Sequence, residues 1–310
     1  MQGDVERAAE ILRSGGLVAF PTETVYGLGA NALDDRAVER IFIAKGRPAT
    51  SPLIVHVSSL QMLDQVVATW PAEADRLAKL FWPGPLSLVL PKRAAIPDRV
   101  TAGLQTVGVR IPAHPLAQAL ISAAGIPVAA PSANRFMGLS PTLAEHVRAS
   151  LGDKVDFVLD GGPTQVGIES TVLSLMDPEH PELLRPGGVS RAALEAAIGP
   201  VASGFSEGGV HLSPGLHHKH YSPATMLVIG HNPSRNDAYL WWSTEKVSAM
   251  NVRMPADPAG YARQLYAVLH RLDYEGLARI VVEPLPPSEE WDALRDRLTR
   301  AAGTEQPEIA

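Results

Sequence analysis

Short apolar runs alternate with helix-spaced apolar positions along the first 200 residues. Apolar runs bounded by Gly or Pro predict strands at 17–20, 53–57, 86–90, 107–111, 127–130, 156–160, 170–175 and 182–185. Apolar positions three and four residues apart predict helices at 4–14, 34–44, 71–82, 115–124, 142–150 and 190–198. Several strands are apolar almost throughout, as in sheets that helices cover on both faces. The pattern therefore predicts an α/β fold with a mixed sheet.

This pattern stops between residues 200 and 223. The stretch is dense in Gly, Ser and Pro and keeps no apolar period, which is typical of a linker. After it, strands are predicted at 226–230, 247–250 and 279–283, and helices at 258–272 and 288–301. We therefore predict three parts, which are a domain at 1–199, a linker at 200–223 and a smaller C-terminal α/β domain at 224–310.

The composition excludes several classes of protein. The formal net charge is −6, so the surface as a whole does not indicate nucleic acid or an anionic membrane as a partner. The absence of cysteine excludes disulfides, zinc–thiolate sites and thiol catalysis. The sequence has no recognisable signal peptide and no apolar stretch near the ~18–20 residues that span a bilayer. We expect a soluble protein in the cytoplasm.

The common nucleotide-binding motifs give little support. No GxxxxGK[ST] motif occurs, which argues against a P-loop enzyme. Residues 27–32 fit GxGxxA after a strand, but no acidic residue follows about 20 positions later to bind a ribose. A dinucleotide site is therefore disfavoured.

Polar residues gather instead at the ends of predicted strands. Hydroxyl, amide and carboxylate side chains occur beside Pro or Gly at 21–24, 131–134 and 167–171, and cations occur at Lys45, Arg47, Arg110 and Arg185. Ligands bind at such strand ends in open α/β sheets. Arg110 interrupts an apolar strand, and a buried guanidinium requires a carboxylate or phosphate partner. In an acidic chain, these cations predict a concave, focused anion-binding cleft.

An ordered set of motifs covers nearly all of residues 16–223. They read FPTETVYGLGANA, KGRP, PLIVHV, WPGPLSLVL, GVRIP, APSAN, SPT, ESTV, LRPGG and SPGLHHKHYSP. In this order they resemble the threonylcarbamoyl-AMP synthase family, whose core is the YrdC-like domain, an open twisted mixed sheet. The pairs Lys45–Arg47 and Ser132–Asn134 distinguish the synthases from looser relatives. The linker and second domain resemble the long, two-domain form.

The resemblance implies a reaction in which L-threonine, bicarbonate and ATP give threonylcarbamoyl-AMP and pyrophosphate. The product would pass to a separate complex that modifies tRNA, and neither a membrane nor a stable nucleic-acid partner is expected. The implied cofactor is Mg²⁺, bound mainly through the ATP phosphates, with Glu23 as a candidate to assist it through water.

The resemblance also implies roles for individual residues. Those expected to bind L-threonine are Thr24, His56, Arg110, Ala130 and Ser170. Those expected to bind ATP are Arg47, Ser51, Thr106, Ser132, Ser140, Arg185 and Tyr221. The catalytic set is Lys45, Arg47, Ser132 and Asn134, and no protein-held metal is expected. Glu169 is interpreted as a structural partner for a nearby cation.

Three alternatives remain at this point. The first is a YrdC-like module that binds RNA without making an adenylate, although the acidic chain argues against it. The second is a carbamoyl-transfer enzyme, whose relatives carry cysteine motifs that this chain lacks. The third is a metal site at His217, His218 and His220, which the linker position and irregular spacing disfavour. The family resemblance implies that the linker closes over the cleft and places Tyr221 against ATP.

Overall fold

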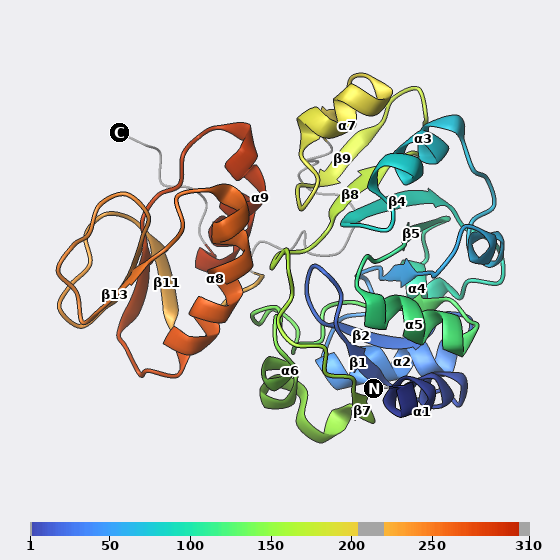
Figure 1. Ribbon diagram of the computed structural model, residues 1–310, viewed down its shortest axis with the longest axis horizontal. Coiled ribbons are helices and arrows are strands. Elements are labelled where there is room, and N and C mark those ends of the chain that lie inside the picture. The colour runs from blue at the N-terminus through green and yellow to red at the C-terminus, as the bar shows by residue number, and fades with distance from the viewer. Residues whose placement is uncertain (1, 204–219, 304–310) are drawn as a thin grey trace.

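The computed structural model describes residues 2–203 and 220–303, which form two lobes (Figure 1). His217 and His218 lie outside these ranges. The larger lobe is built on one mixed sheet. Its ten strands, in spatial order, are β10 (Ala202–Ser203), β9 (Glu182–Arg185), β8 (Thr171–Ser174), β4 (Leu86–Pro91), β5 (Thr106–Arg110), β3 (Ile54–His56), β6 (Val128–Ala129), β2 (Gly27–Asn31), β1 (Val18–Phe20) and β7 (Phe157–Val158).

Helices cover the large sheet. They are α1 (Gln2–Arg13), α2 (Asp35–Lys45), α3 (Ala72–Phe81), α4 (Asp98–Thr101), α5 (Pro115–Ala124), α6 (Ala144–Leu151) and α7 (Arg191–Ile198), with short 3₁₀ segments η1 (Gln61–Gln65) and η2 (Gly152–Lys154). The central strands β2, β3, β4 and β5 are buried along most of their length. Each of them contributes side chains to the largest apolar cluster, which include Leu28, Val55, Leu88 and Val109. This matches the nearly continuous apolar runs of the sequence.

The C-terminal lobe has a small parallel sheet and its own core. The strand order is β11 (Met226–Ile229), β14 (Arg279–Val282), β12 (Ala238–Trp241) and β13 (Met250–Arg253). Helices α8 (Pro258–Asp273) and α9 (Asp292–Ala302), with η3 (Glu289–Trp291), complete it. Both α8 and α9 lie on the side of this sheet that faces the large lobe (Figure 1). No helix in the described ranges has the length and apolarity needed to cross a bilayer.

The structure adds elements that the sequence pattern did not predict. The segment 27–31, considered above only as a possible GxGxxA motif, is strand β2. A Cβ on Gly29 would lie 2.8 Å from both Phe20 and Val128. Glycine at this position therefore allows the Phe20 ring to pack directly against the backbone of β2. Strand β12 and the short elements α4 and β10 were also missed, and the predicted strand 247–250 overlaps β13 only at Met250.

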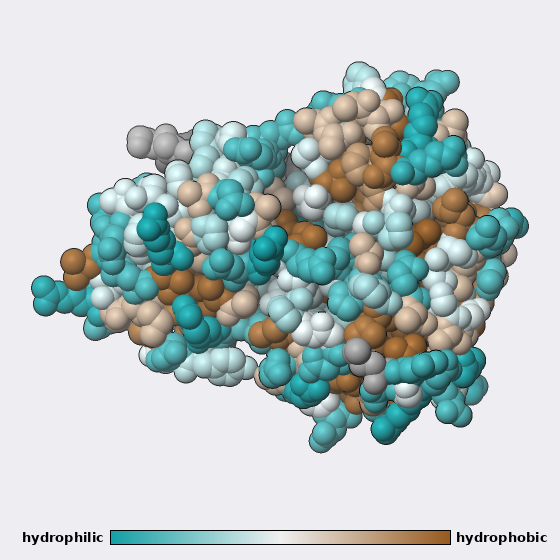
Figure 2. Space-filling model, in the orientation of Figure 1, coloured by the Kyte–Doolittle hydropathy of each residue, from teal (hydrophilic) through white to brown (hydrophobic). Residues whose placement is uncertain are grey.

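The predicted linker begins within the large sheet, because β10 pairs in parallel with β9. At its other end, the backbone of His220 donates to the carbonyl of Arg300, and that of Ser222 donates to the carbonyl of Met137. Residues 220–222 therefore lie between the two lobes. In the space-filling view, the lobes meet along a notch lined by hydrophilic and hydrophobic residues (Figure 2). The domain boundaries at 199 and 223 remain predictions.

Candidate active site

A cavity lies where loops of the large lobe meet residues 220–221. It is lined by Thr22, Thr24, Val25, Gly27, Arg47, Ile54, His56, Arg110, Ala130, Pro131, Ser132, Glu169, Ser170, Arg185, His220 and Tyr221. The sequence-predicted site residues that it brings together are Thr24, Arg47, His56, Arg110, Ala130, Ser132, Ser170, Arg185 and Tyr221. Three arginines, remote in the sequence, thus face one hollow.

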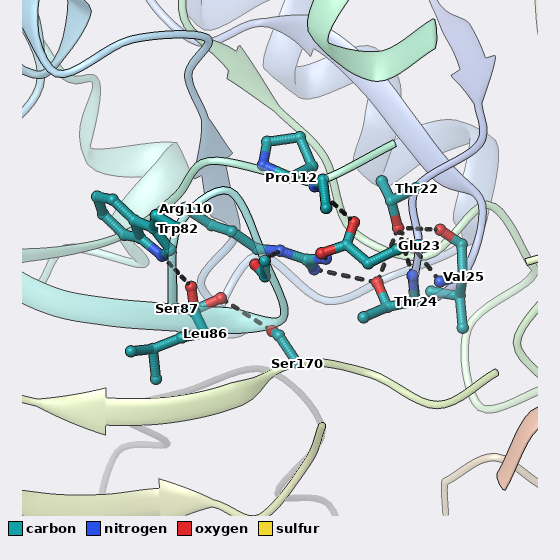
Figure 3. A network of polar contacts seen from close by, with 12 residues as sticks. Thr22, Glu23, Thr24, Val25, Trp82, Leu86, Ser87, Arg110, Pro112 and Ser170 are labelled. Carbon is teal, nitrogen blue, oxygen red and sulfur yellow. Dashed lines mark hydrogen bonds and ion pairs between the residues drawn. The ribbon is translucent and has the colours of Figure 1, made fainter. Parts of the chain in front are cut away.

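Arg110 ends β5 and is held by several oxygens. Its Nη2 forms a 2.5 Å ion pair with Glu23 Oε1, its Nη1 donates to Thr24 Oγ1 at 3.0 Å, and its Nε donates to the Gly84 carbonyl at 3.0 Å. The side chain extends from β5 toward the turn at 22–25 (Figure 3). Glu23 is itself fixed by the backbone N–H of Ala113. The buried guanidinium therefore has the carboxylate partner that the sequence required, and a role of Glu23 beside Mg²⁺ remains a prediction.

Thr22 organises this turn, although the sequence analysis gave it no role of its own. Its hydroxyl donates to the Val25 carbonyl at 2.6 Å and contacts Thr24 Oγ1 at 2.7 Å, while the N–H groups of Thr24 and Val25 donate back to it. These are the bonds of a side chain that closes a turn on its own backbone. They fix the Thr24 hydroxyl in the cavity beside Arg110 (Figure 3).

Helix α2 positions the first two cations. Asp34 caps its start, and Gly46, at φ 63°, ends it in the left-handed conformation that favours glycine. Lys45 is therefore the last residue of the helix, and Arg47 lies just beyond its C-cap. The Lys45 ammonium donates to the carbonyls of Ser132 and Asn134, each at 2.5 Å, and lies 3.4 Å from Asn134 Oδ1. The contacts of Lys45 thus hold the 132–134 turn, and it is not among the cavity-lining residues.

Arg47 lines the cavity and is almost completely buried. Its Nη2 donates to Ser51 Oγ at 2.6 Å and to the Pro52 carbonyl at 3.0 Å, whereas its Nε has no hydrogen-bond partner within the described ranges. Burial is the main cause that lowers the pKa of Arg47 to about 10, and it also lowers the pKa of Lys45 well below its usual value. Three oxygen acceptors nevertheless favour the protonated form of Lys45. A bound anion nearby would stabilise the charged forms of both groups.

Arg185 ends β9 beside Ser170. It donates twice to the Ser170 carbonyl, at 3.1 and 2.9 Å, and once to the Ser170 hydroxyl at 3.2 Å. That hydroxyl also contacts Ser87 Oγ at 2.9 Å (Figure 3). Ser87, a fully buried serine within the apolar strand β4, was missed, although a polar residue in such a strand is a signal. Arg185 and Ser170 are therefore fixed as one unit.

Glu169 joins this unit to the C-terminal lobe. Its carboxylate accepts from Ser140 Oγ at 2.5 Å, from Tyr266 Oη at 3.2 and 3.3 Å, and from Arg297 Nε at 2.7 Å. The structure thus supplies the cation that the sequence interpretation gave to Glu169, and that cation comes from α9. Tyr221 packs beside it, with the Arg297 guanidinium 5.1 Å from its ring centre. The Tyr221 hydroxyl is buried without a hydrogen-bond partner in the described part of the chain.

Several predicted residues do not line the cavity. Ser51 is instead hydrogen-bonded to Arg47, Asn134 to Lys45, and Ser140 to Glu169. Thr106 begins β5, at the opposite end of this strand from Arg110. The expected roles of these residues remain predictions.

His56 lies beside Arg110 because β3 and β5 pair in parallel with His56 opposite Arg110. Burial, followed by the charge of Arg110, lowers the pKa of His56 to about 3. The imidazole is therefore neutral at neutral pH, and it adds no charge to this end of the cavity.

The carboxylates beside the cavity already have cationic partners. No group of three or more His, Asp or Glu side chains within residues 2–203 and 220–303 is placed to hold a metal ion. The two nearest carboxylates, Glu23 and Glu169, are paired with Arg110 and Arg297.

Comparison with known proteins shows the family of the chain. Residues 10–187 match the family model of the Sua5, YciO and YrdC proteins, described as telomere recombination. Residues 189–303 match the model described as the C-terminal domain of threonylcarbamoyl-AMP synthase. The chain belongs to the threonylcarbamoyl-AMP synthase family. The predicted family and its two-domain form are confirmed.

Similar proteins support this membership over almost the whole chain. The threonylcarbamoyl-AMP synthases of Bacillus subtilis (strain 168) and Pyrococcus abyssi (strain GE5 / Orsay) are 42% and 41% identical, and each alignment covers 96% of this chain and 93% of the relative. The solved structure of P. abyssi Sua5 complexed with L-threonine has a TM-score of 0.91 at 38% identity, covering 98% of this chain and 95% of that one. The predicted fold class is confirmed.

Proposed function

We propose that the chain condenses L-threonine, bicarbonate and ATP into threonylcarbamoyl-AMP and pyrophosphate, as a nucleotidyltransferase. The observation that carries this proposal is the convergence of Arg47, Arg110 and Arg185 on one buried cavity, in a member of this family. A cavity with cations and fixed hydroxyls suits an amino acid and a nucleotide held side by side.

The L-threonine carboxylate is assigned to the Arg110 end. Arg110 presents a planar fork to a carboxylate, and the fixed Thr24 hydroxyl adds a polar contact beside it. Neutral His56, Ala130 and Ser170 complete the pocket around the amino acid. The complex of P. abyssi Sua5 with L-threonine supports a threonine site in this fold.

The ATP phosphates are assigned to Arg47 and Arg185, with Lys45 behind them. Arg47 Nε and the Tyr221 hydroxyl are buried polar groups without partners in the described ranges, so a nucleotide would satisfy them. Lys45 fixes the turn that presents Ser132 and Asn134. The roles of Ser51, Thr106 and Ser140 in binding ATP belong to the same proposal.

The chemistry requires positioning more than a tuned acid or base. The threonine amine acquires the bicarbonate carbon, and a carbamate oxygen becomes bonded to the α-phosphorus as water and pyrophosphate leave. Holding the reactants together supplies up to roughly 7–11 kcal/mol of the barrier. The arginines offset charge on the phosphates. We propose that Mg²⁺ arrives with the ATP phosphates, whose charge it would help to neutralise, because Glu23 and Glu169 are already paired with arginines.

The product would serve a separate complex that transfers the threonylcarbamoyl group to tRNA, and we predict a cytoplasmic location. No observation on the fold or the relatives favours the alternative of a module that binds RNA without making an adenylate.

The proposal is tested by mixing the full chain with ATP, bicarbonate and Mg²⁺ and measuring pyrophosphate. Release is expected with L-threonine, and little is expected with serine or with no amino acid. Pyrophosphate release that is independent of threonine, combined with RNA affinity that falls steeply with salt, would favour the RNA-binding alternative.

A further inference from the structure

The cavity has one lining carboxylate whose partners come from both lobes. Glu169 Oε1 accepts from Ser140 and Tyr266, and Glu169 Oε2 accepts from Arg297 and Tyr266. Tyr266 lies on α8 and Arg297 on α9. The C-terminal lobe therefore supplies a hydroxyl and a guanidinium to a group in the candidate active site.

Arg297 is completely enclosed in this cluster. Its side chain has 0% exposure, and besides Glu169 it contacts Asp296 at 2.5 Å and the Pro186 carbonyl at 3.0 Å. Asp296 is also bonded to Arg300. A helix surface rarely buries an arginine completely unless the charge is paired. This arginine bridges the lobes and does not line the cavity.

Glu169 lies next to the ATP end of the cavity. The following residue, Ser170, accepts three hydrogen bonds from Arg185. Burial by itself would raise the pKa of Glu169, but the charges of Arg297 and then Arg185 hold it below its usual value. The carboxylate is therefore ionised at neutral pH, and the charges of both arginines act on it.

Tyr221 is the second group that Arg297 supports. The Arg297 guanidinium lies 5.1 Å from the Tyr221 ring centre, and the Tyr266 ring lies 6.1 Å from it on a tilted plane. Tyr221 has φ 60°, an uncommon conformation for a residue with a side chain, so contacts around the ring must hold it there. Tyr266 and Arg297 thus contact both Glu169 and Tyr221.

We propose that Arg297 is a positioning residue for ATP, which keeps Glu169 away from Arg185 and holds Tyr221 in the cavity. Without Arg297, Glu169 is left as a buried carboxylate beside Arg185 and pairs with it. That pairing withdraws a cation from the phosphates. This inference rests on the proposed function, and it gives the C-terminal lobe a direct part in nucleotide binding.

Arg297→Met tests the proposal, because methionine fills part of the volume without the charge. ATP and L-threonine affinities of the full chain are measured by calorimetry, which requires no turnover, together with the thermal midpoint. ATP affinity should fall about tenfold or more, as expected when one partner of a buried charge pair is removed, and threonine affinity should change by less than about threefold. Adding Glu169→Gln to this variant should recover most of the ATP affinity, because a neutral amide then replaces the carboxylate that would pair with Arg185.

Arg279→Met is the matched control. Arg279 pairs with buried Asp237 at 2.6 Å inside the C-terminal lobe, and neither residue lines the cavity. This variant should lower the thermal midpoint and leave ATP affinity unchanged. If Arg297→Met does not fold, Arg297→Lys and Tyr266→Phe replace it. The former should keep ATP affinity within about threefold, and the latter should lower it by about threefold.

The outcomes separate the two proposals. A folded Arg297→Met protein with wild-type ATP affinity, equal losses in the Arg279 and Arg297 variants, or no recovery with Glu169→Gln would each overturn the inference. For the substitute pair, unchanged ATP affinity in Tyr266→Phe would do the same. A wild-type protein that binds no ATP overturns the proposed function and the inference together.

Discussion

The two ends of the cavity each rest on a buried arginine–glutamate pair, arranged in opposite senses. At one end Arg110 lines the cavity and its partner Glu23 lies behind it, whereas at the other end Glu169 lines the cavity and Arg297 lies behind. The first pair lies within the large lobe and the second joins the lobes. A cation thus faces the ligand at the first end, and a compensated carboxylate at the second.

This difference fits the two ligands. An amino acid offers one carboxylate, which one guanidinium that faces the cavity can bind in a bidentate manner. A triphosphate requires several cations, so a neighbouring carboxylate must be prevented from neutralising them. The hidden partners, Glu23 and Arg297, therefore determine which charge each end presents.

The largest expected effect on stability is at the hidden carboxylate of the first pair. Glu23→Gln leaves Arg110 buried without a counter-charge, and the free energy of unfolding should fall by about 3 kcal/mol. Urea denaturation at neutral pH measures this. Glu73→Gln is the control, since it breaks the exposed Glu73–Arg76 pair, which contributes about 0.5 kcal/mol or less. Similar losses in the two variants would mean that the buried pair contributes no more to the free energy of unfolding than the Glu73–Arg76 pair does.

A smaller effect on stability is expected at the lobe junction near the second pair, where two histidine rings stack. The rings of His146 and His270 are 3.8 Å apart, and His270 Nε2 contacts the carbonyl of Ser140. Burial, followed by the nearby His270, lowers the pKa of His146 to about 3. In the unfolded chain its pKa is about 6.5, so its contribution is complete above that pH and is lost as the pH falls toward 3.

His146→Phe should therefore flatten the loss of stability between pH 7 and pH 5, measured by urea denaturation at several pH values. The control is His180→Phe, because Asp177 raises the pKa of this exposed histidine and its contribution has the opposite sign. The control should not flatten the profile. Equal slopes in wild type and His146→Phe would count against a role for this stack.

Much of the fold and the cavity could be predicted from sequence, because local signals marked them. Apolar spacing predicted helices at 34–44 and 115–124, which correspond to α2 and α5, and Arg110 in an apolar strand indicated a buried charge with a partner. Strand β2 was missed because its glycines suggested a GxGxxA motif, and their reason, the packing of the Phe20 ring against β2, exists only in three dimensions.

The contacts between lobes were the least predictable part. The pairing of Glu169 with Arg297 joins residues 128 positions apart, and no local pattern specifies it. A signal for Arg297 was nevertheless present. It falls three residues after Leu294 and four before Ala301, on the apolar side of a predicted helix, where a cation must find a buried partner.

The account rests on the assignment of threonine to the Arg110 end and ATP to the Arg185 end. The most direct test is to titrate L-threonine and ATP separately into Arg110→Met and Arg185→Met by calorimetry. Arg110→Met should lose threonine affinity by about tenfold or more and retain ATP affinity, and Arg185→Met should do the reverse. Loss of ATP binding in Arg110→Met with threonine affinity intact would contradict the account.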